Sequence, residues 1–434
     1  MLDKVKKLVG AGFFDVFGAS VINNVINFLS SFVLLRILTK TEYGLFTYVW
    51  NTYNVIVLIC GLGLDSGFLQ LSSEKSGDEE YAEKIYSYCV KVGSLFNFVV
   101  TLIFIGIGLF APVKFERSRP LFIFVSALPL IQFIFKMLSV YLRSQKRNKD
   151  YGRLTNINTL LIAVLSLSGA FFFREKGLIL SYYVSYILTL VISFLLSYYP
   201  KWSNESLEKL ESKNLLSISI TSACNIGLSQ LLYLLDVFVI GIIIANELIL
   251  ASYKAASLIP SAMIFVPQAV AIFVYPYFAQ NRLDKKWCLS SYKKLMLIFT
   301  AANLLITIMM YLCVPFLIRF LYGKQYMDSI DAFRVLTVSY FFSASFRVIS
   351  GNLLITQRKL KFNLILSIAT GALNVIGNIV LVKLLGSIGA AYMTLIITII
   401  SGVISTPYLV YCFKSLPDKG LEDGIDKVSN DGLE

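Results

Sequence analysis

Long apolar stretches dominate the sequence and alternate with short segments of charged and turn-forming residues. A bilayer core about 30 Å thick is crossed by roughly 20 apolar residues in a helix. Of the 434 residues, 57% are hydrophobic and only 15% are charged, a balance unlike that of a water-soluble protein. The apolar stretches lie at residues 12–38, 43–71, 84–111, 119–142, 153–173, 177–199, 215–245, 249–279, 289–319, 327–355, 361–384 and 388–413. They predict an all-α polytopic membrane protein with about twelve transmembrane helices.

The predicted spans fall into two sets of six, separated by the longest polar interruption inside the chain. We therefore expect an N-terminal six-helix lobe, a cytoplasmic inter-lobe linker, a C-terminal six-helix lobe and a cytoplasmic tail, at residues 1–200, 201–214, 215–413 and 414–434. Lys and Arg are enriched in alternate loops, as cytoplasmic loops require, and this places both termini in the cytoplasm.

A weak internal repeat accompanies this division. The segment Gln145-Lys146-Arg147 resembles Gln357-Arg358-Lys359, and Gly177 resembles Gly389; both pairs are 212 residues apart. Together with the six-plus-six count, the repeat indicates two similar lobes with a central cavity.

The composition excludes several classes of protein. The chain has no histidine, which argues against a zinc enzyme or a Ser-His-Asp hydrolase, and we expect no metal and no cofactor. A membrane-embedded polymerase or glycosyltransferase would need a polar catalytic loop of tens of residues, which the sequence lacks, so we expect no enzymatic activity. The net charge of +13 is distributed between the spans and forms no continuous patch for nucleic acid.

Ionisable residues occur inside the predicted spans, where each is costly unless it faces water or a partner. Cations facing a cavity suit an anionic cargo, because phosphate oxygens accept charge-assisted hydrogen bonds from Lys and Arg. The candidate substrate-binding residues are Lys136, Arg347, Lys254 and Arg36, of which the first two lie deepest. The candidate ion-coupling carboxylates are Asp15, Asp65 and Asp236. The sequence leaves open whether an ion drives transport and whether that ion would be a proton or sodium.

Uncharged polar residues recur at helical spacing and would suit sugar hydroxyls. Those that we expect to line the cavity are Asn225, Ser229, Gln268, Asn374 and Asn378. In the fourth span, a further stripe consists of Gln132, Lys136, Ser139 and Arg143. Three alternatives stay open: the uncharged stripes are helix-packing seams, Asp236 and Lys254 form a structural ion pair, and Arg36 is an interfacial anchor.

Two short motifs resemble those of a known family. The segment from Leu34 to Phe46 (LLRILTKTEYGLF) and Gly61-Leu62-Gly63-Leu64 resemble the opening of bacterial polysaccharide repeat-unit flippases, in the multidrug/oligosaccharidyl-lipid/polysaccharide exporter superfamily. Asp236, the Ala251-Ser252-Tyr253 turn and Gln357-Arg358 are similar to that family's second half, although Ser252 replaces its usual glycine.

This resemblance implies alternating access in the bacterial cytoplasmic membrane. The implied cargo is an undecaprenyl-diphosphate-linked repeat unit of O-antigen, capsule or exopolysaccharide, and the implied partners are this lipid-linked oligosaccharide, membrane lipids, a polysaccharide polymerase and other assembly proteins. The alternatives on the same fold are a cation-coupled multidrug-type exporter and a cell-wall lipid flippase. A cavity for cationic drugs would favour carboxylates, whereas Lys136 and Arg347 are the deepest charges here.

Overall fold

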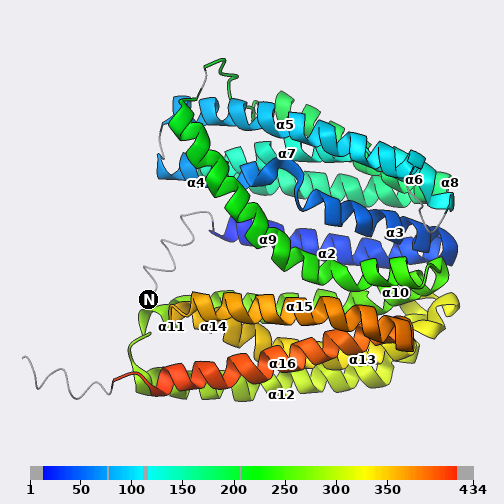
Figure 1. The fold of residues 1–434 in the computed structure, drawn as a ribbon, viewed down its shortest axis with the longest axis vertical. Helices are drawn as coiled ribbons and strands as arrows, with labels where there is room; N and C mark the ends of the chain where they lie inside the picture. Colours follow the sequence, from blue (N-terminus) through cyan, green and yellow to red (C-terminus); the bar gives the residue numbers. More distant parts are fainter. Residues whose placement is uncertain (1–12, 76–77, 111–115, 206, 418–434) are drawn as a thin grey trace, which may run out of the picture. The chain divides into compact units, whose positions relative to one another are not determined.

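The computed structural model describes residues 13–75, 78–110, 116–205 and 207–417, and the regular structure in these ranges is helical, with no strand (Figure 1). Two compact units divide the chain. The first consists of Met1–Ser252 with Leu321–Gly323, and the second of Tyr253–Phe320 with Lys324–Glu434.

The first unit contains all the helices that line the cavity described below. In chain order its elements are α2 (Phe13–Ile37), α3 (Lys40–Val57), the turn η1 (Cys60–Gly63), α4 (Leu64–Glu74), α5 (Glu79–Phe110), η2 (Glu116–Ser118), α6 (Arg119–Val125), α7 (Leu128–Ser144), α8 (Asn148–Leu195) and α9 (Lys209–Ile243). The unit boundary falls inside α10 (Glu247–Met263).

The second unit is also helical throughout its described length. Its elements are α11 (Phe265–Gln280), α12 (Lys285–Leu317), η3 (Ile318–Tyr322), η4 (Lys324–Ser329), α13 (Ile330–Phe342), the π-helical segment η5 (Ser343–Val348), α14 (Ile349–Thr356), α15 (Leu360–Leu385) and α16 (Ser387–Lys414). Part of η3 belongs to the first unit.

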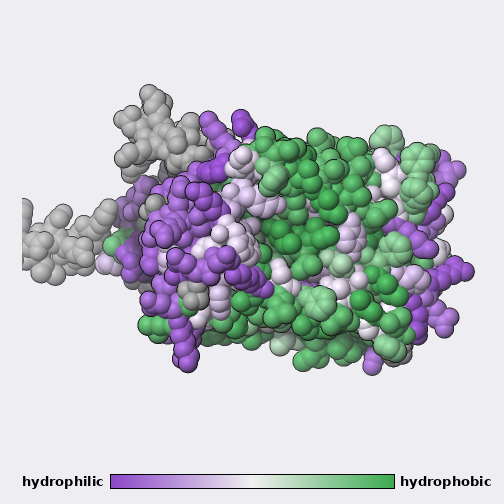
Figure 2. All heavy atoms as spheres, turned by 90° about the horizontal axis from the view of Figure 1, so that it is seen from above, coloured by the Kyte–Doolittle hydropathy of each residue, from purple (hydrophilic) through white to green (hydrophobic). Residues whose placement is uncertain are grey.

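The described helices are long and apolar enough for a multi-pass membrane protein. Nine of them could cross a bilayer, and a tenth span is formed if α3 and α4, bent by 44°, act as one. Helix α8 has 48 residues and reverses direction at Arg174 (φ 56°, ψ −140°), so it contains two of the predicted spans. These helices are compatible with the expected twelve. On the face seen in Figure 2, hydrophobic side chains fill the middle and hydrophilic ones gather at both ends.

The reversal inside α8 depends on a close approach of its two arms. The Ser181 hydroxyl donates to the carbonyl oxygen of Leu165 over 2.6 Å, although the two residues are 16 apart in sequence. A Cβ added to Gly177 would lie only 2.0 Å from the carbonyl oxygen of Gly169. Only glycine allows this contact, which explains its occurrence at position 177.

The backbone supports the internal repeat. Lys146 and Arg358 both have a positive φ, of 58° and 57°, at the same point between two helices. Arg174 (φ 56°, ψ −140°) and Gly386 (φ 67°, ψ −152°) form equivalent reversals. Each pair is 212 residues apart, the spacing at which the sequence motifs recur.

Helix α9 packs on α3, α4 and η1 and is therefore part of the first compact unit. Two glycines of the first unit permit this packing: a Cβ on Gly63 or Gly67 would lie within 2.3 Å of an atom of Ser219 in α9. The division into lobes at residues 200 and 215 stays a prediction about the repeat, because compactness and repeat boundaries are different properties.

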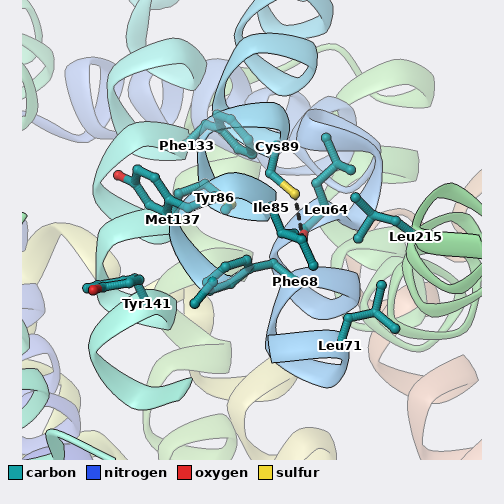
Figure 3. Close-up of a cluster of buried hydrophobic side chains, with 11 residues drawn as sticks. Leu64, Phe68, Leu71, Ile85, Tyr86, Cys89, Phe133, Met137, Tyr141 and Leu215 are labelled. Atoms are coloured by element: carbon teal, nitrogen blue, oxygen red, sulfur yellow. Dashed lines mark hydrogen bonds between the residues drawn. The ribbon is translucent and has the colours of Figure 1, made fainter. Parts of the chain in front are cut away.

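An apolar core lies between α7 and the helices α4, α5 and α9 (Figure 3). Phe133, Met137 and Tyr141 project from α7 at steps of four residues and pack with side chains of α4, α5 and α9. Between membrane helices such a core is stabilised by close van der Waals packing, because lipid supplies no hydrophobic driving force between them. The core therefore fixes the rotation of α7 about its own axis and, with it, the direction of the opposite polar stripe.

Candidate functional site

A cavity of about 440 Å³ lies within the first unit, between α4, α7 and α8. Its wall combines charged, hydroxyl, amide and apolar side chains. The lining residues are Asp65, Ser66 and Leu69 from α4; Gln132, Phe135, Lys136, Ser139, Val140 and Arg143 from α7; and Tyr151, Thr155 and Tyr186 from α8. This volume is in the range of small-ligand sites in proteins.

The polar stripe predicted for the fourth span forms one wall of this cavity. Gln132, Lys136, Ser139 and Arg143 all line it, as their spacing of three or four residues requires. Phe133 and Met137 of the core each follow a residue of the polar stripe by one position, which is about 100° around the helix. Helix α7 therefore has an apolar side and a polar side. The sequence pattern thus predicted correctly that these four side chains share a face.

Lys136 does not enter the cavity as an isolated charge. Its Nζ lies 2.9 Å from Oδ2 of Asp65, within the range of a charge-assisted hydrogen bond. The two side chains differ in exposure, because 57% of Lys136 but only 14% of Asp65 is accessible. An ion pair with one largely exposed partner contributes little to stability.

The turn η1 sets the position of Asp65. Gly61, Leu62 and Gly63 have φ values of 65°, 51° and 69°, a left-handed run that redirects the chain between α3 and α4. Glycine adopts this conformation at little cost, whereas Leu62 is held in it by its neighbours. Asp65 lies in the first turn of α4, directly after this run. The glycine-leucine motif therefore has a structural role, which is to aim α4 and its carboxylate.

Hydrogen bonds fix both ends of the cavity. At one end, the Tyr53 hydroxyl donates to the side-chain carbonyl of Gln132. Near the other end, the buried hydroxyls of Ser72 and Ser144 bond over 3.2 Å and join the ends of α4 and α7. Because Asp65 contacts Lys136 and, about two turns later in each helix, Ser72 contacts Ser144, α4 and α7 run side by side in the same direction. Arg143 lies close to the second end.

The family-like segment from Leu34 to Phe46 also has a structural role. Thr39 and Glu42 form a capping box at the start of α3, in which the Thr39 hydroxyl accepts from the Glu42 amide and the Glu42 carboxylate accepts from the Thr39 amide. At the reversal of α8, Nε of Arg174 lies 3.9 Å from Oε1 of Glu42, and Nη1 of Arg174 donates to the carbonyl oxygen of Ile37. This motif fastens the junction of α2 and α3 to the tip of the α8 hairpin.

The other predicted substrate-binding cations lie elsewhere. Arg36 is exposed, donates from Nε to the carbonyl oxygen of Leu321, and is not among the residues that line the cavity. Lys254 is half-buried in α10. Arg347 is half-buried in η5, and it forms no ion pair with the residues that the structure describes. Their roles in binding stay predictions.

The remaining predicted residues are distributed over both units. Asp236 is half-buried in α9, and Gln268 is exposed in α11. Asn374 and Asn378 are buried in α15, where the Asn378 amide donates to the Asn374 side-chain carbonyl over 2.6 Å. The pairing of Asp236 with Lys254 stays a prediction. The side chains of Asp15, Asn225 and Ser229 lie outside the described part of the structure.

The sequence did not single out all the groups that meet at the cavity. Arg143 was part of the polar stripe, and its position seven residues after Lys136 was the available signal. Tyr151, Thr155 and Tyr186 come from α8, and only the packing of α8 against α7 brings them to the site. No group of three or more Cys, Asp or Glu side chains suited to a metal ion occurs in the described ranges.

Comparisons with known proteins agree with this architecture. Residues 33–331 match a family described as "Polysaccharide biosynthesis protein". No curated protein matches the chain in sequence.

Solved structures share the fold. An inward-facing multidrug resistance MATE transporter of the MOP superfamily has a TM-score of 0.71 at 14% identity, over 91% of this chain and 95% of that chain. The lipid II flippase MurJ, in an inward closed conformation, has a TM-score of 0.70 at 16% identity, over 92% and 87%. A MOP superfamily transporter from Pyrococcus furiosus, whose binding pocket is described as reversed in polarity, has a TM-score of 0.59 at 15% identity, over 95% and 96%.

Proposed function

The chain belongs to the polysaccharide biosynthesis protein family, and from this premise we propose that it is a flippase for undecaprenyl-diphosphate-linked oligosaccharides. The direction of transfer is from the cytoplasmic to the outer leaflet of the bacterial cytoplasmic membrane, by alternating access. The products supply O-antigen, capsule or exopolysaccharide synthesis. The family and the transporter fold support a transport function over an enzymatic one.

The observation that carries the proposal is the charge of the cavity. Lys136 and Arg143 line it together with a single carboxylate, Asp65, which leaves one positive charge in excess. In a region of low dielectric constant, an excess cation attracts an anionic head group and disfavours a cationic one. A diphosphate offers several oxygens that can each accept a hydrogen bond from Lys or Arg.

The uncharged end of the cavity suits sugar. Gln132 and Tyr186 contribute amide and hydroxyl groups there, and Phe135 adds an aromatic face. Sugars have both hydroxyl groups and apolar ring faces, so this mixture complements them. In this arrangement the diphosphate lies between Lys136 and Arg143, and the first sugar lies toward Gln132. The prenyl chain needs no polar site and stays in lipid.

The second candidate function, export of small cationic compounds, has the MATE likeness in its favour. That likeness extends to the fold only, at 14% identity. The excess positive charge of the cavity argues against a cationic cargo. We retain Asp65 and Asp236 as candidate ion-coupling residues, with the coupling ion a proton or sodium.

Reconstituted transport tests the proposal. Purified protein in liposomes receives a polyprenyl diphosphate carrying one N-acetylhexosamine, and a membrane-impermeant lectin reports the fraction of sugar on each leaflet. Lys136→Ala should lower the transfer rate about tenfold, the loss expected for one charge-assisted hydrogen bond. Lys149→Ala is the matched control, because Lys149 is exposed and does not line the cavity. An unchanged rate for Lys136→Ala at normal protein levels would refute the proposal.

A further inference from the structure

The ion pair in the cavity has one fixed and one mobile partner. Asp65 is nearly buried, and its backbone is held between the left-handed turn η1 and the contact of α4 with α9. Lys136 is more than half exposed, on a long and flexible side chain. An incoming anion can therefore draw Lys136 away, whereas Asp65 has to stay where it is.

Removal of Lys136 would leave Asp65 without its cation. Around Asp65, the cavity offers the Ser66 hydroxyl at 3.5 Å, and α5 presents Cys89, whose thiol donates to the carbonyl of Leu64. Neither supplies a positive charge. An anion that merely replaces Asp65 on Lys136 thus exchanges one ion pair for another and isolates a nearly buried carboxylate, which is unfavourable.

Arg143 provides the additional ion pair that this exchange lacks. It lies two helical turns beyond Lys136 on the same face of α7, about 10.5 Å along the helix axis at 1.5 Å per residue. It is exposed to the cavity and forms no ion pair with any residue described in the structure. Lys and Arg side chains are long enough to converge on two linked phosphates from positions two turns apart.

Resting on the proposed function, we propose that Asp65 is a specificity-determining residue that acts as an internal counter-ion of Lys136. A lipid with one phosphodiester, such as phosphatidylglycerol, can pair with Arg143, but at Lys136 it only replaces Asp65 and gains no ion pair there. A diphosphate lipid places one phosphate on Lys136 and the second on Arg143, and so gains one pair overall. Asp65 therefore keeps abundant membrane phospholipids off Lys136, whereas the diphosphate carrier reaches Lys136 and Arg143 together.

Equilibrium binding tests this role with two probes. The protein in zwitterionic nanodiscs is titrated with dioleoyl phosphatidylglycerol and, separately, with a polyprenyl diphosphate carrying one N-acetylhexosamine, and bound lipid is counted by native mass spectrometry. Asp65→Asn should tighten the binding of phosphatidylglycerol about tenfold, which corresponds to one released ion pair. In transport assays, phosphatidylglycerol should then inhibit Asp65→Asn but not the unaltered protein.

Matched variants separate this effect from a loss of structure. Asp65→Glu retains the charge and should restore weak phosphatidylglycerol binding. Asp150→Asn removes another carboxylate from a 2.9 Å ion pair, with Arg147, outside the cavity lining, and should change neither affinity. In a Lys136→Gln background, Asp65→Asn should not change the binding of phosphatidylglycerol, because Asp65 acts on it only through Lys136. The two single variants and the double variant form a double-mutant cycle that measures this dependence. Arg143→Gln should weaken the binding of the diphosphate lipid about tenfold, and it should also weaken the binding of phosphatidylglycerol, because Arg143 is the lining cation that Asp65 does not pair with.

The outcomes distinguish this inference from the proposed function. If Asp65→Asn binds phosphatidylglycerol no more tightly than the unaltered protein while Lys136→Gln loses the diphosphate lipid, the counter-ion role is wrong and the flippase proposal survives. Equal binding of the diphosphate lipid by Arg143→Gln and the unaltered protein would also overturn the inference. If the unaltered protein does not bind the diphosphate lipid, the proposed function fails as well.

Discussion

Helices α6 and α7 together and the segment from Ile330 to Thr356 occupy corresponding places in the two halves of the repeat. Ser118 and Ser329, which directly precede α6 and α13, are 211 residues apart, whereas Lys146 and Arg358 are 212 apart. One extra residue has therefore entered the second segment between these points. The π-helical η5 accounts for it, since a π-helical turn holds more residues than an α-helical turn.

The two segments place their cations in different surroundings. At the spacing of 211 residues, Lys136 corresponds to Arg347, which lies inside η5. Lys136 projects from regular helix and is paired with Asp65. Arg347 is half-buried and has no ion pair among the described residues. One of the two corresponding charges is therefore neutralised within the protein, whereas the other forms no ion pair with the described residues and lies in a π-helical turn, a feature that is frequent at functional sites.

Single-residue deletions test whether η5 contains the extra residue, and they should have the largest effects. Deletion of Ile134 would rotate the remainder of α7 by about 100°, since an α-helix has 3.6 residues per turn, and would turn Met137 and Tyr141 out of their core. We expect no monodisperse protein in size-exclusion chromatography.

Deletion of Ser345 is the matched change in the second segment. It should convert η5 to regular α-helix and preserve a yield close to that of the unaltered protein. Ser345 is buried, and its hydroxyl has no hydrogen-bond partner in the described structure, so its loss removes an unfavourable group. Equal loss of protein in both deletions would show that η5 is not the site of the inserted residue.

Substitution of the two cations sharpens the comparison of their surroundings. Arg347→Ala should lower lipid transfer about 30-fold, whereas Lys136→Ala should lower it about tenfold, because binding at Lys136 first has to break an existing ion pair. The leaflet assay measures both rates at matched protein levels. An equal or larger effect of Lys136→Ala would contradict the view that Asp65 already offsets part of its charge.

A glycine beside α7 should give the smallest of these effects. A Cβ on Gly93 of α5 would lie 2.1 Å from the ring of Phe133, so Gly93→Ala should lower the unfolding free energy by about 1–3 kcal/mol, the usual cost of overpacking. Thermal unfolding of the detergent-solubilised protein would show a lower midpoint. Gly351→Ala in α14 is the control, because its Cβ would meet no atom within 4 Å, and its midpoint should not fall. Equal midpoints for the two variants would contradict a tightly filled core behind α7.

Much of this architecture follows from local sequence patterns. The expected spans fall on observed helices, although the span 43–71 is broken at η1 and the span 249–279 is divided between α10 and α11. The predicted interruption near residue 174 is the reversal within α8. The polar stripe of α7 faces one cavity because residues three or four apart always share a helical face. The pairing of Lys136 was not predicted, since Asp65 is 71 residues away and nothing in either local pattern identifies its partner.

The sequence by itself determined that this protein spans a membrane and which face of α7 is polar. Hydropathy and helical periodicity act along the chain over a few turns, so they can be recognised without knowledge of the packing. Only the tertiary structure decided that α9 packs on α4, that α8 supplies three lining residues, and that Lys136 meets a fixed carboxylate. These contacts depend on how helices from distant parts of the chain approach one another, and side chains of only a few ångströms in length cannot meet unless that approach is correct.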